Sequence, residues 1–213
     1  MRTRAWARTS AHLQRCWPRL FRRALQESHW RAFRGTVDSG NVGNLGSLDA
    51  ETNIRLEPAL GGGSLLDVGS YCVSLLRLVT GEEPDQVRSC ATFGPSGVDV
   101  QHAGVLHFPS GALGHFDCGI RGAPAQGYEV RGTKGRLVVE RGFTMEPDEA
   151  PVLRVWRGSK MEQEEIAPTN HFTKMAEEFG EALLQRRPLR YPASDAVKNH
   201  RVLDALFEAA RAS

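Results

Sequence analysis

Residues 61–71 read GGGSLLDVGSY, and this stretch predicts the start of a buried helix. Three glycines run directly into an apolar segment that carries one aspartate, Asp67, and one tyrosine, Tyr71. A serine followed three residues later by an acid is a capping-box pattern, so Ser64 and Asp67 predict the start of a helix. The apolar residues that follow suit a largely buried helix, and Gly81 stands where a C-terminal cap belongs.

The glycines match no known nucleotide-binding motif. A dinucleotide fingerprint needs GxGxxG between a strand and a helix, with an acid about 20 residues further on, and GGGSLL lacks that spacing. A Walker loop ends in Gly-Lys-Ser/Thr, which is missing here. Residues 38–48 (DSGNVGNLGSL) match neither motif and are predicted to be a loop. We therefore expect the three glycines to let the backbone approach a ligand or a neighbouring element closely.

Downstream, short apolar segments joined by turn signals predict hairpin-linked strands. The expected strands are Gln86–Phe93, Val98–Phe108, Ala112–Cys118, Tyr128–Arg131, Arg136–Glu140, Val152–Trp156 and Met161–Ile166. Two helical patterns follow, the second one after a Ser194 cap, and the first with an apolar face made of Phe172, Met175, Ala176, Phe179, Ala182 and Leu183. This order predicts an α+β fold, with a predominantly antiparallel or mixed open sheet and helices on one face. The other face of the sheet would need water or a partner subunit.

One predicted hairpin has a polar face that invites a metal hypothesis. Pairing Phe108 with Ala112 across the PSG turn places His107, His115 and Asp117 on the same side of the sheet. Two histidines and an acid could bind a metal ion, whereas the alternative is a polar face that is exposed or lies at a dimer interface. We adopt the polar face and predict no metal site.

The net charge of +2 hides an asymmetry along the chain. Residues 1–35 contain nine arginines and one acid, with three interleaved tryptophans, whereas residues 36–213 carry a net charge of −6. The acidic body gives no reason to expect nucleic-acid binding. For residues 1–35 three interpretations stay open: a basic helical extension packed on the body, a remnant of a larger protein or misplaced start, and a transit segment or binding arm. We divide the chain accordingly into this head and a body domain, residues 36–213.

The cysteines and the apolar segments indicate the compartment. Four scattered cysteines without a CxxC pair are typical of reduced thiols, so we expect a cytoplasmic protein. No apolar run approaches the roughly 18–20 residues that a bilayer requires, so no membrane span is expected.

Asp67 and Tyr71 are the first candidates for a functional site. They are four residues apart and therefore share one face of the predicted helix. In a purely structural interpretation, Asp67 closes the capping box and Tyr71 is a core aromatic. In a functional one, they line a single pocket, where a carboxylate accepts hydrogen bonds from substrate hydroxyls and a phenol relays a proton to or from a carbonyl oxygen.

At this point a family resemblance becomes visible. Residues 53–84 (NIRLEPALGGGSLLDVGSYCVSLLRLVTGEEP) resemble the C-terminal domain of the Gfo/Idh/MocA oxidoreductases, most closely the glucose–fructose oxidoreductase and dihydrodiol dehydrogenase branch. The resemblance continues through FPSGALGHFDC, YEVRGTKGRLVVE, NHFTKMAEEFGEAL and ASDAVKNHRVLDALFEAAR, in the order of the family. It implies an NAD(P)-dependent oxidoreductase that acts on a sugar, a polyol or a related hydroxyl or carbonyl substrate. It also implies catalytic roles for Asp67 and Tyr71, and substrate contacts for Asn53, Arg55 and His171.

The chain departs from the family in two respects. It has no Rossmann fingerprint, and EEP at residues 82–84 is not the Glu-Lys-Pro motif whose lysine takes part in catalysis in the family. The resemblance therefore implies a substrate half that does not hold NAD(P) by itself, with a separate nucleotide-binding chain as one partner. We also expect a homo-oligomer through the open sheet face. The alternative is a truncated, non-catalytic homologue that acts as a dimerising or sugar-binding module.

Overall fold

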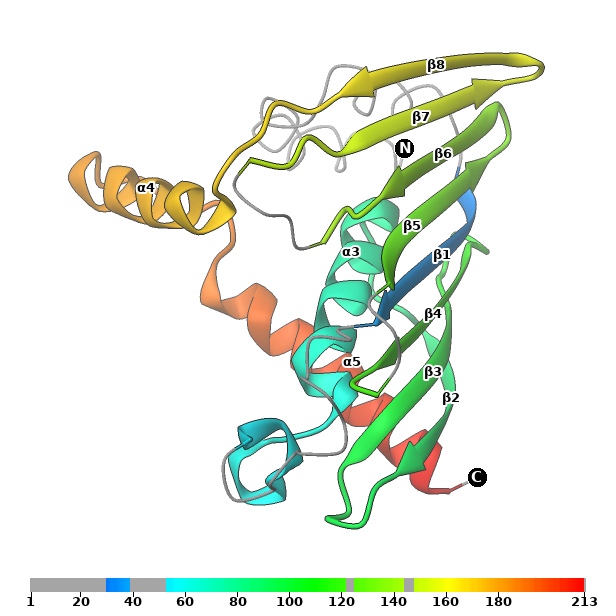
Figure 1. Cartoon of the computed structure of the whole chain (residues 1–213), viewed down its shortest axis with the longest axis vertical. Helices are drawn as coiled ribbons and strands as arrows, with labels where there is room; N and C mark the ends of the chain where they lie inside the picture. Colours follow the sequence, from blue (N-terminus) through cyan, green and yellow to red (C-terminus); the bar gives the residue numbers. More distant parts are fainter. Residues whose placement is uncertain (1–29, 39–52, 122–124, 144–147, 213) are drawn as a thin grey trace.

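The computed structural model describes residues 30–38, 53–121, 125–143 and 148–212, and they build one open eight-stranded sheet with helices on one face (Figure 1). The strands follow one another across the sheet in the order β2-β3-β4-β1-β5-β6-β7-β8. The predicted α+β fold with a mixed open sheet is thereby confirmed. The strands are β1 (Trp30–Asp38), β2 (Gln86–Phe93), β3 (Asp99–His107), β4 (Leu113–Gly119), β5 (Ala125–Gly132), β6 (Gly135–Glu140), β7 (Val152–Arg157) and β8 (Lys160–Glu165).

Strand β1 is the element that the sequence pattern did not predict. It runs parallel to β4 and antiparallel to β5 in the middle of the sheet. The helical interpretation of the head is therefore wrong for residues 30–35, whereas residues 1–29 lie outside the described residues. Both neighbours of β1 lie far along the chain, so long-range backbone pairing overrides the local arginine-rich pattern.

The segment around the three glycines forms four short consecutive helical elements. Two 3₁₀ turns, η1 (Ile54–Leu56) and η2 (Pro58–Leu60), precede the π-helical turn η3 (Leu65–Gly69), which continues directly into the α-helix α3 (Ser70–Thr80). Helix α3 ends as predicted, because Gly81 adopts a left-handed φ of 68° and its N–H donates to the carbonyl of Arg77.

By length and composition alone, Pro58–Thr80 is long and apolar enough to cross a membrane, which our sequence analysis did not anticipate. In the structure this segment is interrupted at the glycines, and one side of it is buried against the sheet. A core helix of a folded domain passes the same compositional test, so the segment is weak evidence for a membrane span.

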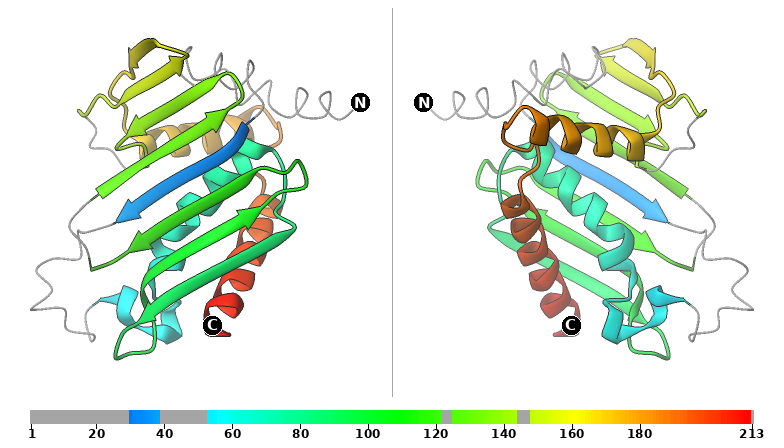
Figure 2. Two further views of the ribbon diagram at one scale, coloured as in Figure 1. Left: turned by 90° about the vertical axis from the view of Figure 1, so that its right-hand side faces the viewer. Right: turned by 90° about the vertical axis from the view of Figure 1, so that its left-hand side faces the viewer.

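The core lies between α3, helix α5 (Ala193–Arg211) and the inner face of the sheet (Figures 1 and 2). The predicted hairpin register is confirmed, with His107 opposite Leu113 and Val105 opposite His115. Gly114 permits the close approach of α3, because a side chain at this position would collide with Leu76. The core side chains include Leu65, Val68, Cys72, Val73, Leu76, Leu106, Phe108, Phe116, Cys118, Val130, Leu137, Leu153, Leu203 and Leu206.

A buried arginine joins α3 to α5. The Arg77 side chain is only 6% exposed; its Nε and Nη2 bond the Glu83 carboxylate at 2.8 and 2.9 Å, and Nη2 also bonds Asp195 Oδ1 at 2.8 Å. Helix α5 begins at Ala193, and its N-cap is Pro192, so the predicted Ser194 cap is wrong by two residues. The Arg77 network fixes this end of α5 in place of a capping side chain.

Helix α4 (His171–Leu184) stands apart from the sheet (Figure 1). The expected apolar face exists, but of its members only Ala182 is buried, whereas Phe172, Met175 and Phe179 are each more than half exposed. The Glu178 carboxylate bonds Arg187 in the following loop at 2.8 and 2.9 Å, and this pairing lowers the pKa of Glu178 to about 2. Helix α4 is thus tied to its own C-terminal loop rather than packed by its apolar side.

Candidate functional site

The centre of the candidate site is an ion pair in the π-helical turn. Asp67 lies in η3, and its Oδ2 accepts a hydrogen bond from Nε of Arg55 at 2.6 Å. Both side chains are partly exposed, at 28% for Asp67 and 41% for Arg55. Single π-helical turns inside α-helices are frequent at functional sites. In this position Asp67 presents a carboxylate whose second oxygen makes no hydrogen bond to any described residue, so it can accept one from a ligand hydroxyl.

The capping-box prediction is wrong in its details. Ser64 makes no side-chain cap bond to the helix, and Asp67 pairs with Arg55 instead of reaching back to the helix start. The N–H of Asp67 donates to the carbonyl of Gly63 at 3.2 Å, and the Ser64 hydroxyl bonds Asp99, so the reciprocal bonds of a capping box are not formed. The structural interpretation of Asp67 as a simple capping residue therefore does not hold.

Tyr71 lies in the first turn of α3, four residues after Asp67. It is 48% exposed, so it is not the core aromatic that the structural interpretation required. Within the described part of the chain no hydrogen bond holds its hydroxyl group. The phenol is therefore free to meet a ligand on the same helical face as Asp67.

Asn53 places the backbone of Arg55. It caps η1 with its Oδ1, which accepts the N–H of Arg55 at 3.0 Å. The structure thus brings Asn53, Arg55 and Asp67 together, and their roles in catalysis and substrate binding stay predictions. His171 is not brought to them, because it begins α4, which lies at the opposite end of α3 from η3 (Figures 1 and 2).

Asp99 receives the start of the helix, a role that was not predicted from the sequence. Its Oδ2 accepts the hydroxyl of Ser64 at 2.7 Å and the N–H of Leu65 at 2.8 Å, and its side chain is fully buried. Gly63 adopts a φ of +114°, and any Cβ at this position would collide with Asp99 Oδ1. The available signal was an acid between Val98 and Val100, where an apolar residue would be expected in a buried strand.

The backbone amides of the glycine stretch do not form a phosphate cradle. The N–H groups of Gly61, Gly62 and Gly63 donate to the carbonyls of Pro58, Glu57 and Arg55 at 3.1, 3.0 and 2.8 Å. The N–H of Leu65 is held by Asp99. Phosphate binding at a helix start needs free N–H groups, and here these groups already have partners. The described residues of this segment therefore do not fit a dinucleotide.

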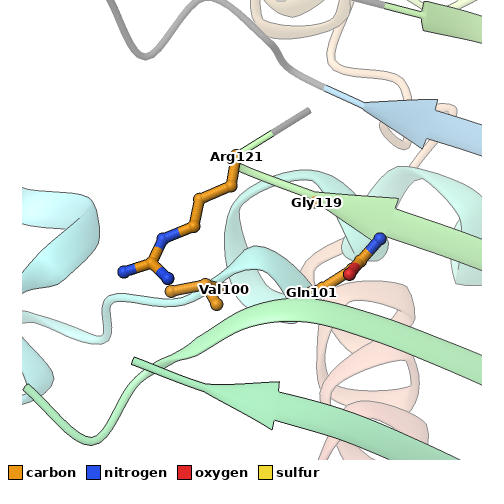
Figure 3. A pocket seen from close by; sticks show the side chains of 4 residues that line it. All are labelled: Val100, Gln101, Gly119 and Arg121. Atoms are coloured by element: carbon orange, nitrogen blue, oxygen red, sulfur yellow. The ribbon is translucent and has the colours of Figure 1, made fainter. Parts of the chain in front are cut away.

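A small pocket lies where β3 begins and β4 ends. It encloses about 110 Å³ and is lined by Val100, Gln101, Gly119 and Arg121, with the Arg121 side chain extending over Val100 (Figure 3). Binding sites for drug-sized ligands and cofactors enclose about 300–1,000 Å³. This pocket can therefore admit a few water molecules or one small group, and not a nicotinamide dinucleotide.

On the outer face of the β3–β4 hairpin, a histidine of the metal hypothesis is paired with an acid. His107 Nδ1 lies 2.6 Å from Asp85 Oδ1, so this histidine already has a carboxylate partner. Among residues 30–38, 53–121, 125–143 and 148–212, no group of three potential ligands is arranged to hold a metal ion.

Comparison with known proteins places these observations in a family. Residues 29–138 match the model described as the GFO/IDH/MocA C-terminal domain. The D-xylose 1-dehydrogenase (NADP(+)) 2 of Haloferax volcanii is 33% identical over 163 residues, which is 76% of this chain and 50% of that enzyme. The chain spans about half the length of the curated relatives it matches.

Two solved structures share the fold. A 3-ketoreductase from Actinomadura kijaniata, in complex with NADP and TDP-benzene, has a TM-score of 0.77 at 23% identity; the match covers 93% of this chain and 61% of that one. The aldose-aldose oxidoreductase of Caulobacter crescentus, complexed with glycerol, has a TM-score of 0.75 at 26% identity; the match covers 90% and 56%. Both matches extend over almost the whole of this chain.

Proposed function

The chain belongs to the GFO/IDH/MocA family and matches its C-terminal domain. We propose that it is the substrate half of an NAD(P)-dependent oxidoreductase acting on a sugar, a polyol or a related hydroxyl or carbonyl compound. The observation that carries the proposal is the Arg55–Asp67 ion pair with Tyr71 four residues further on. The names of the relatives support the substrate class, because they include a xylose dehydrogenase and an aldose-aldose oxidoreductase.

In this proposal Asp67 binds and orients the reacting hydroxyl. Arg55 occupies Oδ2, so Oδ1 accepts the hydroxyl proton of the substrate in a hydrogen bond. Tyr71 then donates a proton to the oxygen of a carbonyl substrate or accepts one from a hydroxyl. Asn53 acts indirectly, by fixing the backbone of Arg55. His171 contacts the same substrate only if α4 moves toward Asp67, or if the substrate reaches from Asp67 to α4.

Neither the glycine segment nor the pocket beside Arg121 fits a dinucleotide, so we infer that its site lies elsewhere. The glycine amides are occupied, and the pocket beside Arg121 is too small. We propose that a separate nucleotide-binding chain, or a part of the protein outside the described residues, holds NAD(P) against this surface. In this arrangement the described surface contributes substrate binding and proton transfer.

The test uses the purified chain with two probes. D-xylose binding is followed by saturation-transfer NMR, and NADPH and NADH binding by nicotinamide fluorescence. We expect saturable xylose binding that Asp67→Asn and Tyr71→Phe each weaken at least about tenfold. Tyr191→Phe is the matched control, because Tyr191 is similarly exposed at 54% and lies in the loop before α5. Xylose binding that is equal in all four proteins would refute the assignment of Asp67 and Tyr71.

A second candidate function is a dimerising module, and the uncovered face of the sheet favours it. Val105 and Leu113 are 47% and 50% exposed on adjacent strands of that face, which no helix of the described chain covers (Figure 1). We propose that a second copy covers them. Sedimentation velocity of the chain and of Val105→Glu tests this, and a wild type that stays monomeric at high concentration would refute it.

A further inference from the structure

A strand supplies the cap that the site helix lacks. Asp99 stands at the start of β3, and its Oδ2 accepts hydrogen bonds from Ser64 Oγ and from the N–H of Leu65. A carboxylate at a helix start is favoured both by these bonds and by the helix dipole. The first turn of the helix that carries Asp67 and Tyr71 is therefore anchored on another element, and not by its own sequence.

Gly63 connects Asp99 to the Arg55–Asp67 ion pair. Its N–H donates to the carbonyl of Arg55 at 2.8 Å, and its carbonyl accepts the N–H of Asp67 at 3.2 Å. Its backbone passes directly beside Asp99 Oδ1, where no side chain would fit. Both members of the Arg55–Asp67 pair are thus bonded to one glycine that rests against the buried carboxylate. We therefore expect a shift of Asp99 to displace that glycine and, with it, both partners.

The Asp99 carboxylate lies against a buried histidine of the same strand. His102 Nδ1 lies 3.5 Å from Oδ2, and the side chains of Asp99 and His102 are both buried completely. The His102 ring is stacked on Phe116, with centroids 6.3 Å apart, and meets the edge of Phe207 of α5 at 5.8 Å. The strand, the helix start and α5 therefore share one closely packed corner.

We propose that Asp99 is a positioning residue of the candidate site: through Gly63 and the first helical turn, it sets where the Asp67 carboxylate and the Tyr71 hydroxyl stand. The inference rests on the proposed function. Asp99 is fully buried, so it touches no ligand itself and acts through the helix start. Its effect on ligand binding is therefore indirect, and it has to be visible as a displacement of the residues that it positions.

The experiment follows Tyr71 by 19F NMR in protein labelled with 3-fluorotyrosine. The chain has three tyrosines, Tyr71, Tyr128 and Tyr191, and Tyr71→Phe assigns the site signal by its disappearance. Asp99→Ala removes the oxygen that accepts both bonds, so we expect the Tyr71 signal to shift or broaden, while the other two signals keep their positions. Ser64→Ala removes only one of the two donors to Asp99, so it should move the Tyr71 signal in the same direction by a smaller amount.

Two comparisons separate positioning from general damage. Val155→Ala opens a cavity in the core under β7, which lies near the opposite edge of the sheet from β3. It should lower the melting temperature without moving the Tyr71 signal. If Asp99→Ala does not fold, Ser64→Ala is used in its place. An unchanged Tyr71 signal in folded Asp99→Ala, or in Ser64→Ala where Asp99→Ala does not fold, overturns the proposal. So does a shift in Val155→Ala as large as in the Asp99 variant.

Binding of D-xylose, measured in the same samples, distinguishes this proposal from the proposed function. A moved Tyr71 signal together with xylose binding weakened at least about tenfold supports both. A moved Tyr71 signal in a protein that binds no xylose, even as wild type, supports the positioning role and refutes the substrate assignment. Wild-type xylose affinity in a folded Asp99→Ala protein overturns the positioning role and leaves the substrate assignment standing.

Discussion

Replacing Arg77 by methionine tests how strongly the α3–α5 connection stabilises the fold. Methionine keeps the apolar stem in its buried place and removes the guanidinium, so Glu83 and Asp195 lose their common partner. Hydrogen bonds to charged groups contribute about 1.5–3 kcal/mol each. Both carboxylates are nearly half exposed, so water can rehydrate them when the guanidinium is removed. We therefore count at most about 1.5 kcal/mol for each of the two carboxylates, and expect the free energy of unfolding to fall by about 2–3 kcal/mol.

The assay is equilibrium unfolding in urea, together with a thermal melt. We expect a lower midpoint at an unchanged m-value, and a melting temperature lower by roughly 4–12 °C for a chain of this size. The matched control is Arg187→Met, which breaks the Arg187–Glu178 pair on the helix that stands apart, and it should cost clearly less. A loss below about 1 kcal/mol for Arg77→Met, or equal losses in the two variants, would refute the reasoning.

The same substitution predicts a pH dependence. Chiefly through its hydrogen bond, Arg77 holds the pKa of the Glu83 carboxyl below its usual value. In acid, unfolded Glu83 therefore binds a proton before folded Glu83 does, so its stabilising contribution is present above about pH 4.5 and is lost as the pH falls through the lowered value. Urea midpoints between pH 6 and pH 3 should consequently fall less steeply in Arg77→Met than in the wild type. Parallel curves would contradict this account.

Three further predictions concern the glycine, the exposed helix face and the thiols. Gly63→Ala should lower the melting temperature and move the Tyr71 19F signal, because its Cβ collides with the Asp99 carboxylate; an unchanged melt would contradict the close approach. Phe179→Lys should change the unfolding free energy by less than about 0.5 kcal/mol, because Phe179 is 53% exposed, and a loss typical of core residues would show that the face is covered in solution. Cys90 is exposed and should react with a thiol reagent in the native protein, whereas Cys72, whose pKa is raised by burial, should react only on unfolding, as mass spectrometry of the labelled peptides can show.

The sequence predicted well whatever depends on neighbouring residues. Helix α3 was found from its apolar spacing and from the glycine that ends it, and the strands were found from alternation and turns, with β2 at its observed limits. The hairpin register followed from the PSG turn, because a short turn allows few pairings and one face has to be apolar.

What the sequence did not predict depends on partners that are distant along the chain. Strand β1 obtains its hydrogen bonds from β4 and β5, far downstream, so its own residues carry little strand signal. The anchor at Asp99 lies 35 residues from Ser64, and a capping pattern within the helix was the simpler local explanation. On α4 the apolar periodicity was recognised correctly, but periodicity says nothing about whether another element covers the face.

The place of β1 in the sheet has a consequence for the order in which this chain can fold. The strands on its two sides form sequential antiparallel groups, β2–β4 and β5–β8, whose members pair with close neighbours along the chain. Only β1 joins the two groups, although it is synthesised before either of them. It can pair with β4 and with β5 only after each of them has been synthesised, and closing such distant contacts is slow. We therefore expect the late, rate-limiting event of folding to be the insertion of β1 between β4 and β5, although β1 precedes both in the sequence.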